Sequence, residues 1–176
     1  PPNRGKSLEK KILTDFKLYN IPCPRPDSVI KDRFDQGAVC LSAHKNDEFA
    51  GCFWYIKDGY QEDEVRCRYN LISDDSVWDF DVYVEPKFRL SPVFLKLWDE
   101  ASERLINEGY RYSFSRISAF NPMSMASHKR MGAEMLGSAV FFSIGSVQIM
   151  MATLPPFLHL SFNSQSFPVF KLKTHN

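Results

Sequence analysis

The sequence has no strong charge of either sign, no metal-binding cysteine pattern and no long apolar run. Its 22 basic side chains nearly balance its 21 acidic ones, which leaves a net charge of +1. That balance excludes a strongly basic nucleic-acid-binding protein. The four cysteines contain no CxxC pair and no histidine cluster accompanies them, so we expect no metal site. Such thiols stay free in a reducing compartment, and we expect the cytoplasm.

Charged residues are absent between Met135 and Phe170. Serines, glycines and prolines interrupt that stretch before 18 apolar residues accumulate, so we expect no membrane span. Its pattern predicts two strands, Met135–Ile144 and Val147–Thr153, which form a hairpin. The tail over 155–176 carries Phe157, Phe162, Phe167 and Phe170. Four rings of this size are expected to be packed rather than left in water.

The length of 176 residues suits one domain. Apolar residues make up 44% and charged residues 24%, which is ordinary for a globular protein and excludes a disordered chain. We expect a single domain over 1–154, with a helical part over 1–36 and a sheet core over 37–154, before the tail. The sequence begins with Pro and not with a signal peptide, which indicates a trimmed or partial chain.

Hydrophobic spacing predicts the elements of the N-terminal half. Leu8, Ile12 and Phe16 recur at four-residue intervals, which predicts a helix over 6–20. A second, shorter helix is expected over 27–36. The sequence then predicts a hairpin of strands 38–43 and 48–57, and an acidic loop over 59–64.

A strand with regular alternation is expected over 77–84. The alternation places Trp78, Phe80, Val82 and Val84 on one face, and Asp79, Asp81 and Tyr83 on the other. The surrounding segment 58–85 is strongly acidic, so it is either a solvated acidic surface or a field that attracts a cationic ligand.

The second half of the chain predicts alternating helices and strands. Ser91 is expected to cap a helix that runs to Glu108, with Gly109 behind it. A strand over 112–120 and a short helix over 121–132 follow. The whole order predicts a mixed α/β or α+β fold, in which helices flank both faces of a mostly antiparallel sheet.

Two of these segments carry recognisable motifs. The first is the strand end Val84-Glu85-Pro86 with Arg89 and a helix start at Ser91-Pro92, and the second is the helix over 121–133. Both runs resemble the GNAT family of CoA-dependent N-acetyltransferases. The element order resembles the family over about 37–153, but the specific motifs cover only 84–92 and 121–133. Pro92 and Phe94 stand where the family usually has small residues.

The resemblance implies that an acyl-CoA, above all acetyl-CoA, binds between strands 77–84 and 112–120. Glycines in the family's loop let backbone N–H groups approach phosphate at a helix N-terminus, and Pro92 contributes no N–H. The residues implied in acyl-CoA binding are Val82, Tyr83, Val84, Arg89, Leu90, Ser91, Val93, Phe94, Asn121 and Ser124. A backbone N–H near Tyr83 would polarise the thioester carbonyl.

The resemblance also implies the catalytic groups. His128 stands where the family usually has the Tyr that protonates the departing thiolate. Imidazolium can replace phenol there, since it is the stronger acid, with unperturbed pKa values of about 6.5 against about 10. Asp81 or Asp79 would take the proton of a primary amine, directly or through water.

Two other functions remain open from the sequence. A non-catalytic module of the same fold would bind acyl-CoA or a protein partner without turnover. A Ser-His-Asp hydrolase is disfavoured because no GxSxG motif is present. A homodimer through the C-terminal hairpin or the tail is also expected to be compatible with the sequence.

Overall fold

A computed structural model describes residues 8–174, which form two compact units. The described part of the first unit comprises 8–58 and 74–114, and that of the second comprises 59–73 and 115–174. The expected domain over 1–154 and the tail over 155–176 are therefore divided differently, because the tail belongs with 59–73. Among the described residues, no helix is long and apolar enough to cross a membrane.

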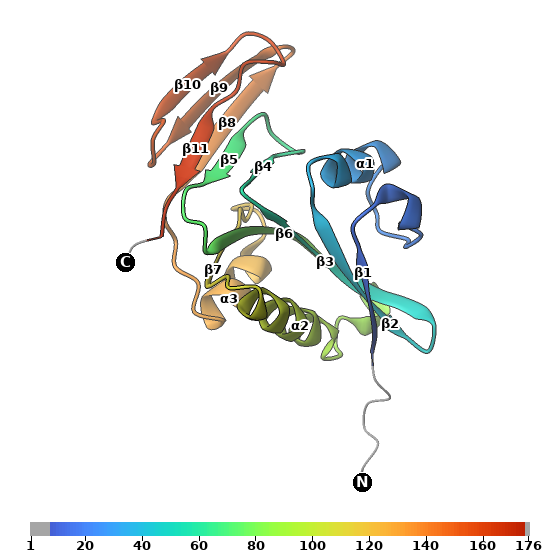
Figure 1. Cartoon of the computed structure of the whole chain (residues 1–176). Coiled ribbons are helices and arrows are strands. Elements are labelled where there is room, and N and C mark those ends of the chain that lie inside the picture. The colour runs from blue at the N-terminus through green and yellow to red at the C-terminus, as the bar shows by residue number, and fades with distance from the viewer. Residues whose placement is uncertain (1–7, 175–176) are drawn as a thin grey trace. The chain divides into compact units, whose positions relative to one another are not determined.

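The first unit is built on a five-stranded sheet with the order β1-β2-β3-β6-β7 (Figure 1). Its strands are β1 (Glu9–Leu13), β2 (Val39–Lys45), β3 (Glu48–Lys57), β6 (Ser76–Val84) and β7 (Tyr112–Phe114). Neighbouring strands are antiparallel except for β6 and β7, which are parallel. The predicted mixed α/β fold with a mostly antiparallel sheet is thus confirmed.

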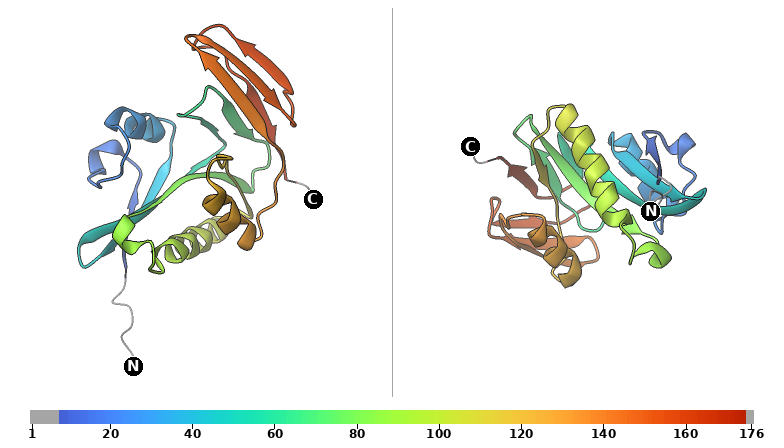
Figure 2. Two further views of the ribbon diagram at one scale, coloured as in Figure 1. Left: turned by 180° about the vertical axis from the view of Figure 1, so that it is seen from behind. Right: turned by 90° about the horizontal axis from the view of Figure 1, so that it is seen from below.

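Helices cover both faces of this sheet. Helix α2 (Val93–Asn107) buries Leu97 and Ala101 against Phe53 on β3, and Figure 2 shows it running across the sheet. Helix α1 (Asp27–Asp35) covers the opposite face, where the Phe34 ring lies 5.1 Å from that of Trp54. We call these the α2 face and the α1 face.

The end of α2 follows the prediction, and its start does not. Gly109 has φ of +93°, and the N–H of Tyr110 bonds the carbonyl of Leu105, which closes the helix as a Schellman turn. Ser91 does not cap the helix, because its hydroxyl donates to the carbonyl of Phe88 at 2.6 Å. Pro92 occupies the capping position instead.

The helix predicted over 6–20 is wrong where the structure describes it, and residues 6 and 7 lie outside the described residues. Glu9–Leu13 forms the edge strand β1, and a 3-10 turn, η1, spans Phe16–Leu18. The register of β1 with β2 buries Leu13 and leaves Ile12 46% exposed. Pairing with an open sheet edge outweighs a weak helical spacing in so short a segment.

The second unit holds two three-stranded sheets. One has the order β11-β5-β4, from β4 (Gly59–Gln61), β5 (Arg68–Leu71) and β11 (Val169–Leu172). The other has the order β10-β9-β8, from β8 (Ala139–Ile144), β9 (Val147–Ala152) and β10 (Leu158–Ser161). The predicted β8–β9 hairpin is confirmed, and the loop expected over 59–64 begins as a strand instead.

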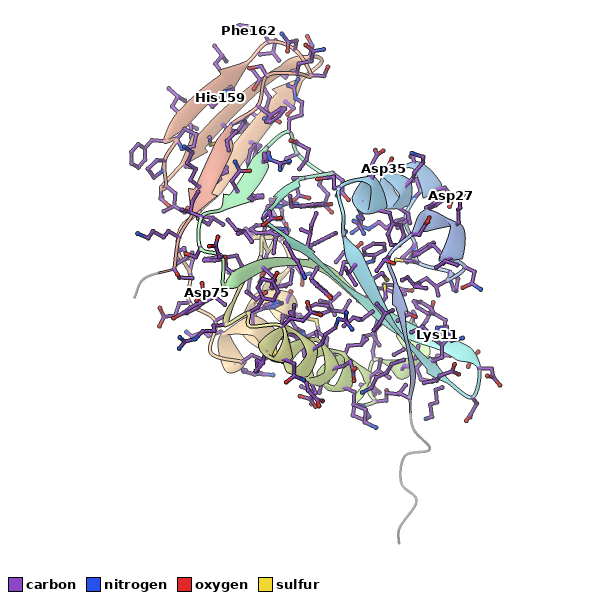
Figure 3. All side chains as sticks on the ribbon, in the orientation of Figure 1. Lys11, Asp27, Asp35, Asp75, His159 and Phe162 are labelled. Carbon is purple, nitrogen blue, oxygen red and sulfur yellow. The ribbon has the colours of Figure 1, made fainter. Side chains whose placement is uncertain are left out.

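The tail is only partly packed. Phe170 is 3% exposed and its ring stacks on Tyr69 at 5.4 Å, so the prediction is confirmed there. It is wrong for Phe157 and Phe162, which are 63% and 65% exposed. Figure 3 labels Phe162 just beyond β10.

Candidate functional site

Strand β6 loses its partner on one edge part-way along its length. It pairs with β7 only over Ser76–Trp78, and the strand expected over 112–120 ends at Phe114. Among the described residues, no strand pairs with the edge of Asp79–Val84 that faces away from β3. Unpaired strand edges present N–H and C=O groups that an extended ligand can bond.

A β-bulge lies in the same stretch. Asp81 has φ of +48°, and the β3–β6 register shifts between the pairs Trp54–Phe80 and Cys52–Tyr83. A bulge inserts one residue and reverses the alternation beyond it. The predicted alternation is therefore wrong after Phe80.

The reversal separates the two candidate bases. Asp79 pairs with Tyr55, a residue of the α2-face core, whereas Asp81 bonds arginines on the α1 face. Val82 and Val84 pack against the α2-face core, and Tyr83 pairs with Cys52. Asp79 and Asp81 therefore lie on opposite faces of the sheet.

Asp81 is held by two arginines. Arg25 Nε and Nη2 donate to its two carboxylate oxygens at 2.9 and 3.0 Å, and Arg33 Nη1 donates at 2.6 Å. Burial alone would raise the pKa of Asp81, but the hydrogen bonds from Arg25 and the charge of Arg33 lower it below its usual range. A carboxylate in this state is a weak proton acceptor.

Asp79 lies where β6 parts from β7. It is the first residue of β6 beyond the paired segment, it is 3% exposed, and Ser113 Oγ donates to it at 2.5 Å. Ser113 belongs to β7, so this bond joins the two strands beside their divergence. A hollow of about 130 Å³ on the α2 face is lined by Val77 and Ser113 together with Phe53, Trp98 and Tyr112.

The loop between β6 and α2 turns tightly. A 3-10 turn, η2, spans Pro86–Phe88, Arg89 Nε donates to the carbonyl of Val84 at 3.3 Å, and Leu90 is fully exposed. Helix α2 starts at Val93, and the N–H groups of its first turn have no acceptor within the helix. These N–H groups and the helix dipole favour binding of an anion at this end. Val93 itself is buried, and the Phe94 ring packs edge-on against Trp98.

Asn121, Ser124 and His128 lie together on helix α3 (Pro122–Arg130) of the second unit. Asn121 caps the helix by accepting from the Ser124 N–H at 3.0 Å. His128 Nδ1 lies 2.8 Å from the Ser124 carbonyl oxygen, which can only accept, so Nδ1 carries a proton. Acid–base chemistry of this ring then falls to Nε2.

Arginines pair with Glu62, Glu64 and Asp81 of the acidic segment 58–85. In the second unit, Arg116 donates to Glu62 at 2.9 Å and also bonds Glu64. Burial raises the pKa of Glu62, and Arg116 opposes that rise. These pairs, with those of Asp81, compensate part of the cation-attracting field that the sequence suggested.

Sequence reasoning missed Arg25, Arg33 and Ser113. The sequence contained only an indirect indication of them: a carboxylate expected in the middle of a sheet needs a cation or a hydrogen-bond donor beside it. The sequence offered no means of choosing those partners among its 22 basic residues. Within residues 8–174, no group of three or more His, Cys, Asp or Glu side chains could hold a metal ion.

Comparison with known proteins identifies the fold through solved structures and not through sequence. No protein-family model matches the sequence, and no curated protein sequence matches it either. Among solved structures, the aminoglycoside N-acetyltransferase AAC(6')-Iy in complex with CoA matches with a TM-score of 0.54 at 18% identity, over 82% of this chain and 99% of that one. The chain has the fold of the GNAT N-acetyltransferases.

Further GNAT-type structures give the same result. An aminoglycoside acetyltransferase from an uncultured soil metagenomic sample, in complex with sisomicin, has a TM-score of 0.52 at 10% identity, over 78% of this chain and 96% of that one. A Trypanosoma brucei acetyltransferase has a TM-score of 0.51 at 13% identity, over 78% of this chain and 100% of that one. The GNAT fold predicted from two short motifs is confirmed.

Proposed function

We propose that the protein is an acyl-CoA-dependent N-acyltransferase that moves an acetyl or other short acyl group to a primary amine. The observation that carries the proposal is the parting of β6 from β7 beyond Trp78, next to a bulge at Asp81, in a chain with the GNAT fold. AAC(6')-Iy, which shares this fold, was solved with CoA bound.

The open edge of β6 would hold the pantetheine arm. Backbone groups of Val82, Tyr83 and Val84 would pair with its amides as a neighbouring strand would. Arg89 and the first N–H groups of α2, at Val93 and Phe94, would contact the pyrophosphate, because a guanidinium and a helix start both favour anions. Leu90 and Ser91 would border it, and for Asn121 and Ser124 a role in acyl-CoA binding rests on the family resemblance alone.

Acyl transfer would proceed by direct attack. The amine nitrogen adds to the thioester carbonyl, whose oxyanion a backbone N–H near Tyr83 stabilises. The C–S bond then breaks, and the CoA thiolate takes a proton, a role that the family resemblance gives to Nε2–H of the His128 imidazolium. Asp79 takes the amine proton, directly or through water, so that the products are an amide and CoA.

Asp81 would serve the site in another way. Its bonds to Arg25 and Arg33 keep it ionised and weakly basic, which does not suit proton removal from an amine. Its positive φ lies at the bulge itself, so these bonds hold the bulge open. We therefore assign it to positioning β6 and leave the base role to Asp79.

Acetyl-CoA titration tests the proposal. Acetyl-CoA at 100 times its Kd should stabilise the fold by roughly 2.7 kcal/mol through mass action, and Arg89→Ala should reduce that gain. Lys17→Ala, a cation on η1, is the matched control and should leave it unchanged. A melting temperature that millimolar acetyl-CoA does not move would refute the proposal.

A non-catalytic acyl-CoA-binding module is the second candidate. Pro92 lacks an N–H where the pyrophosphate loop would need one, and the Ser91 hydroxyl is turned to the Phe88 carbonyl. Release of CoA over a panel of amines separates the two functions. Binding without CoA release supports the module, and release supports the enzyme.

A further inference from the structure

The sheet of β8, β9 and β10 has one buried and one exposed face. On the buried face, Met150 and Gln148 are 0% and 1% exposed. Gln148 accepts from the Arg66 N–H at 3.1 Å and donates to the Arg66 carbonyl at 2.8 Å, beside β5 in the same unit. This face is therefore fixed to the rest of the second unit.

The opposite face is apolar and exposed. The register places eight side chains on it, all between 37% and 86% exposed: Val140, Phe142, Ile144, Val147, Ile149, Met151, Leu158 and Leu160. We call this the outer face of the hairpin sheet. At about half exposure each, these side chains offer on the order of 600 Å² of apolar surface. Monomers seldom expose a continuous apolar patch larger than a few hundred Å².

We propose that the outer face is covered by the same face of a second copy of this chain. No Asp, Glu, Lys or Arg occurs between Met135 and Phe170, so nothing on it repels an identical face or selects a charged partner. The available area approaches the roughly 800 Å² per partner of a standard interface, and homodimer interfaces are the more apolar class. A two-fold axis brings identical patches together, which suits a face with one kind of surface throughout.

The free edge of this sheet also favours a second copy of the chain as the partner. Strand β8 is at the edge in the order β10-β9-β8, and its six residues include no charge and no proline. Proteins usually protect such edges with lysine, proline or a bulge. The proposal does not depend on acyl transfer, and it gives the dimer expected from the sequence a defined surface.

Light scattering coupled to size exclusion tests the proposal on the whole chain. The wild type should be a dimer at about 50 µM, and Ile149→Glu and Ile149→Lys, central on the outer face, should each be monomers. An equal mixture of the two variants should regain the dimer, which a misfolded variant could not do. Leu18→Glu, at an exposed apolar residue on η1 of the first unit, should stay dimeric.

Amide exchange on the wild type provides a measurement without a variant. Residues 139–151 should exchange at least tenfold more slowly at about 100 µM than at dilutions where the dimer dissociates. A wild type that stays monomeric to about 100 µM would overturn the proposal. So would a dimer that survives both Ile149 substitutions.

Discussion

Asp81 joins residues that are distant in the sequence. Arg25 precedes α1, Arg33 is on α1 and is 2% exposed, and both donate to one carboxylate on β6. The Arg33 guanidinium also lies 5.3 Å from the Trp54 ring and 5.0 Å from the Phe80 ring. Because Arg33 is buried, the Asp81 carboxylate helps to compensate its charge.

Neutralising Asp81 should therefore destabilise the first unit. We expect Asp81→Asn to cost roughly 3 kcal/mol, since it removes the carboxylate charge to which a buried arginine donates. All three tryptophans, Trp54, Trp78 and Trp98, lie in the first unit, so urea unfolding followed by tryptophan fluorescence measures the loss. Asp35→Asn, which breaks an exposed pair with Lys31 on α1, is the control and should leave the midpoint unchanged.

Acid should reproduce the effect of that substitution. The pKa of Asp81 is lower in the folded chain than in the unfolded one, so its stabilisation is complete above the unfolded pKa of about 3.9. It is lost as the pH falls through the folded value. The difference in unfolding free energy between wild type and Asp81→Asn should be constant from pH 5 to 7 and shrink below about pH 4. A difference that is undiminished at pH 2 would contradict this assignment.

His128 should affect chemistry more than stability. Helix α3 has no buried residue, so His128→Ala removes little packing. As general acid the ring would contribute about 10²–10⁴-fold in rate, and acetyl-CoA affinity should change little. Steady-state turnover measures the loss, and His128→Tyr should restore part of it because phenol can also donate a proton. Full turnover by His128→Ala would remove the residue from the mechanism.

Strand β6 shows which parts of an element sequence patterns can predict. Its ends, at Ser76 and Val84, lie within one residue of the prediction, because alternating aromatic and aliphatic residues favour a strand. The bulge could not be predicted, since it depends on two arginines reaching Asp81 from elsewhere in the chain. The β1 helix prediction failed for a similar reason, because the pairing partner lies about 30 residues away.

The close approach of β3 and β6 depends on Gly51. A Cβ at this position would lie 2.5 Å from the Tyr83 carbonyl oxygen and 3.2 Å from Val84 Cα. We expect Gly51→Ala to displace β6, to destabilise the first unit by about 1–3 kcal/mol and to weaken acetyl-CoA binding. Tryptophan-monitored unfolding and isothermal titration measure the two effects.

Gly145→Ala provides the comparison. Gly145 has φ of +57° and open space around it, so alanine there strains only the backbone of the β8–β9 turn. Since this turn belongs to the second unit, the tryptophan-monitored midpoint should not move. Equal shifts from the two substitutions would show that steric contact with β6 is not the cause.

At the scale of the molecule, unfolding of the two units should be distinguishable, because tryptophan fluorescence reports on the first unit. The second unit contains no tryptophan in its described residues, and its C-terminal strand β11 pairs in parallel with β5. The Phe170–Tyr69 stack lies across that pair. Loss of this stack should therefore change signals other than tryptophan fluorescence.

We expect Phe170→Ala to destabilise the second unit by about 3–5 kcal/mol, the usual cost of emptying a buried aromatic site. Far-ultraviolet circular dichroism should lose sheet signal at lower urea than the tryptophan transition. Phe162→Ala, which truncates a ring that is 65% exposed, should shift neither probe. If circular dichroism and fluorescence shifted together for Phe170→Ala, the units would unfold as one cooperative body.

The β5–β11 pair also sets an order of events during synthesis. Arg68 emerges from the ribosome about 100 residues before its partner Val169, whereas every strand of the first unit is complete once Phe114 has been made. Closing so long a loop is entropically costly and cannot begin until the last residues are released. The nascent chain therefore carries the β4–β5 pair with one edge of β5 open until β11 is made, and this is the interval in which a chaperone would have most to protect.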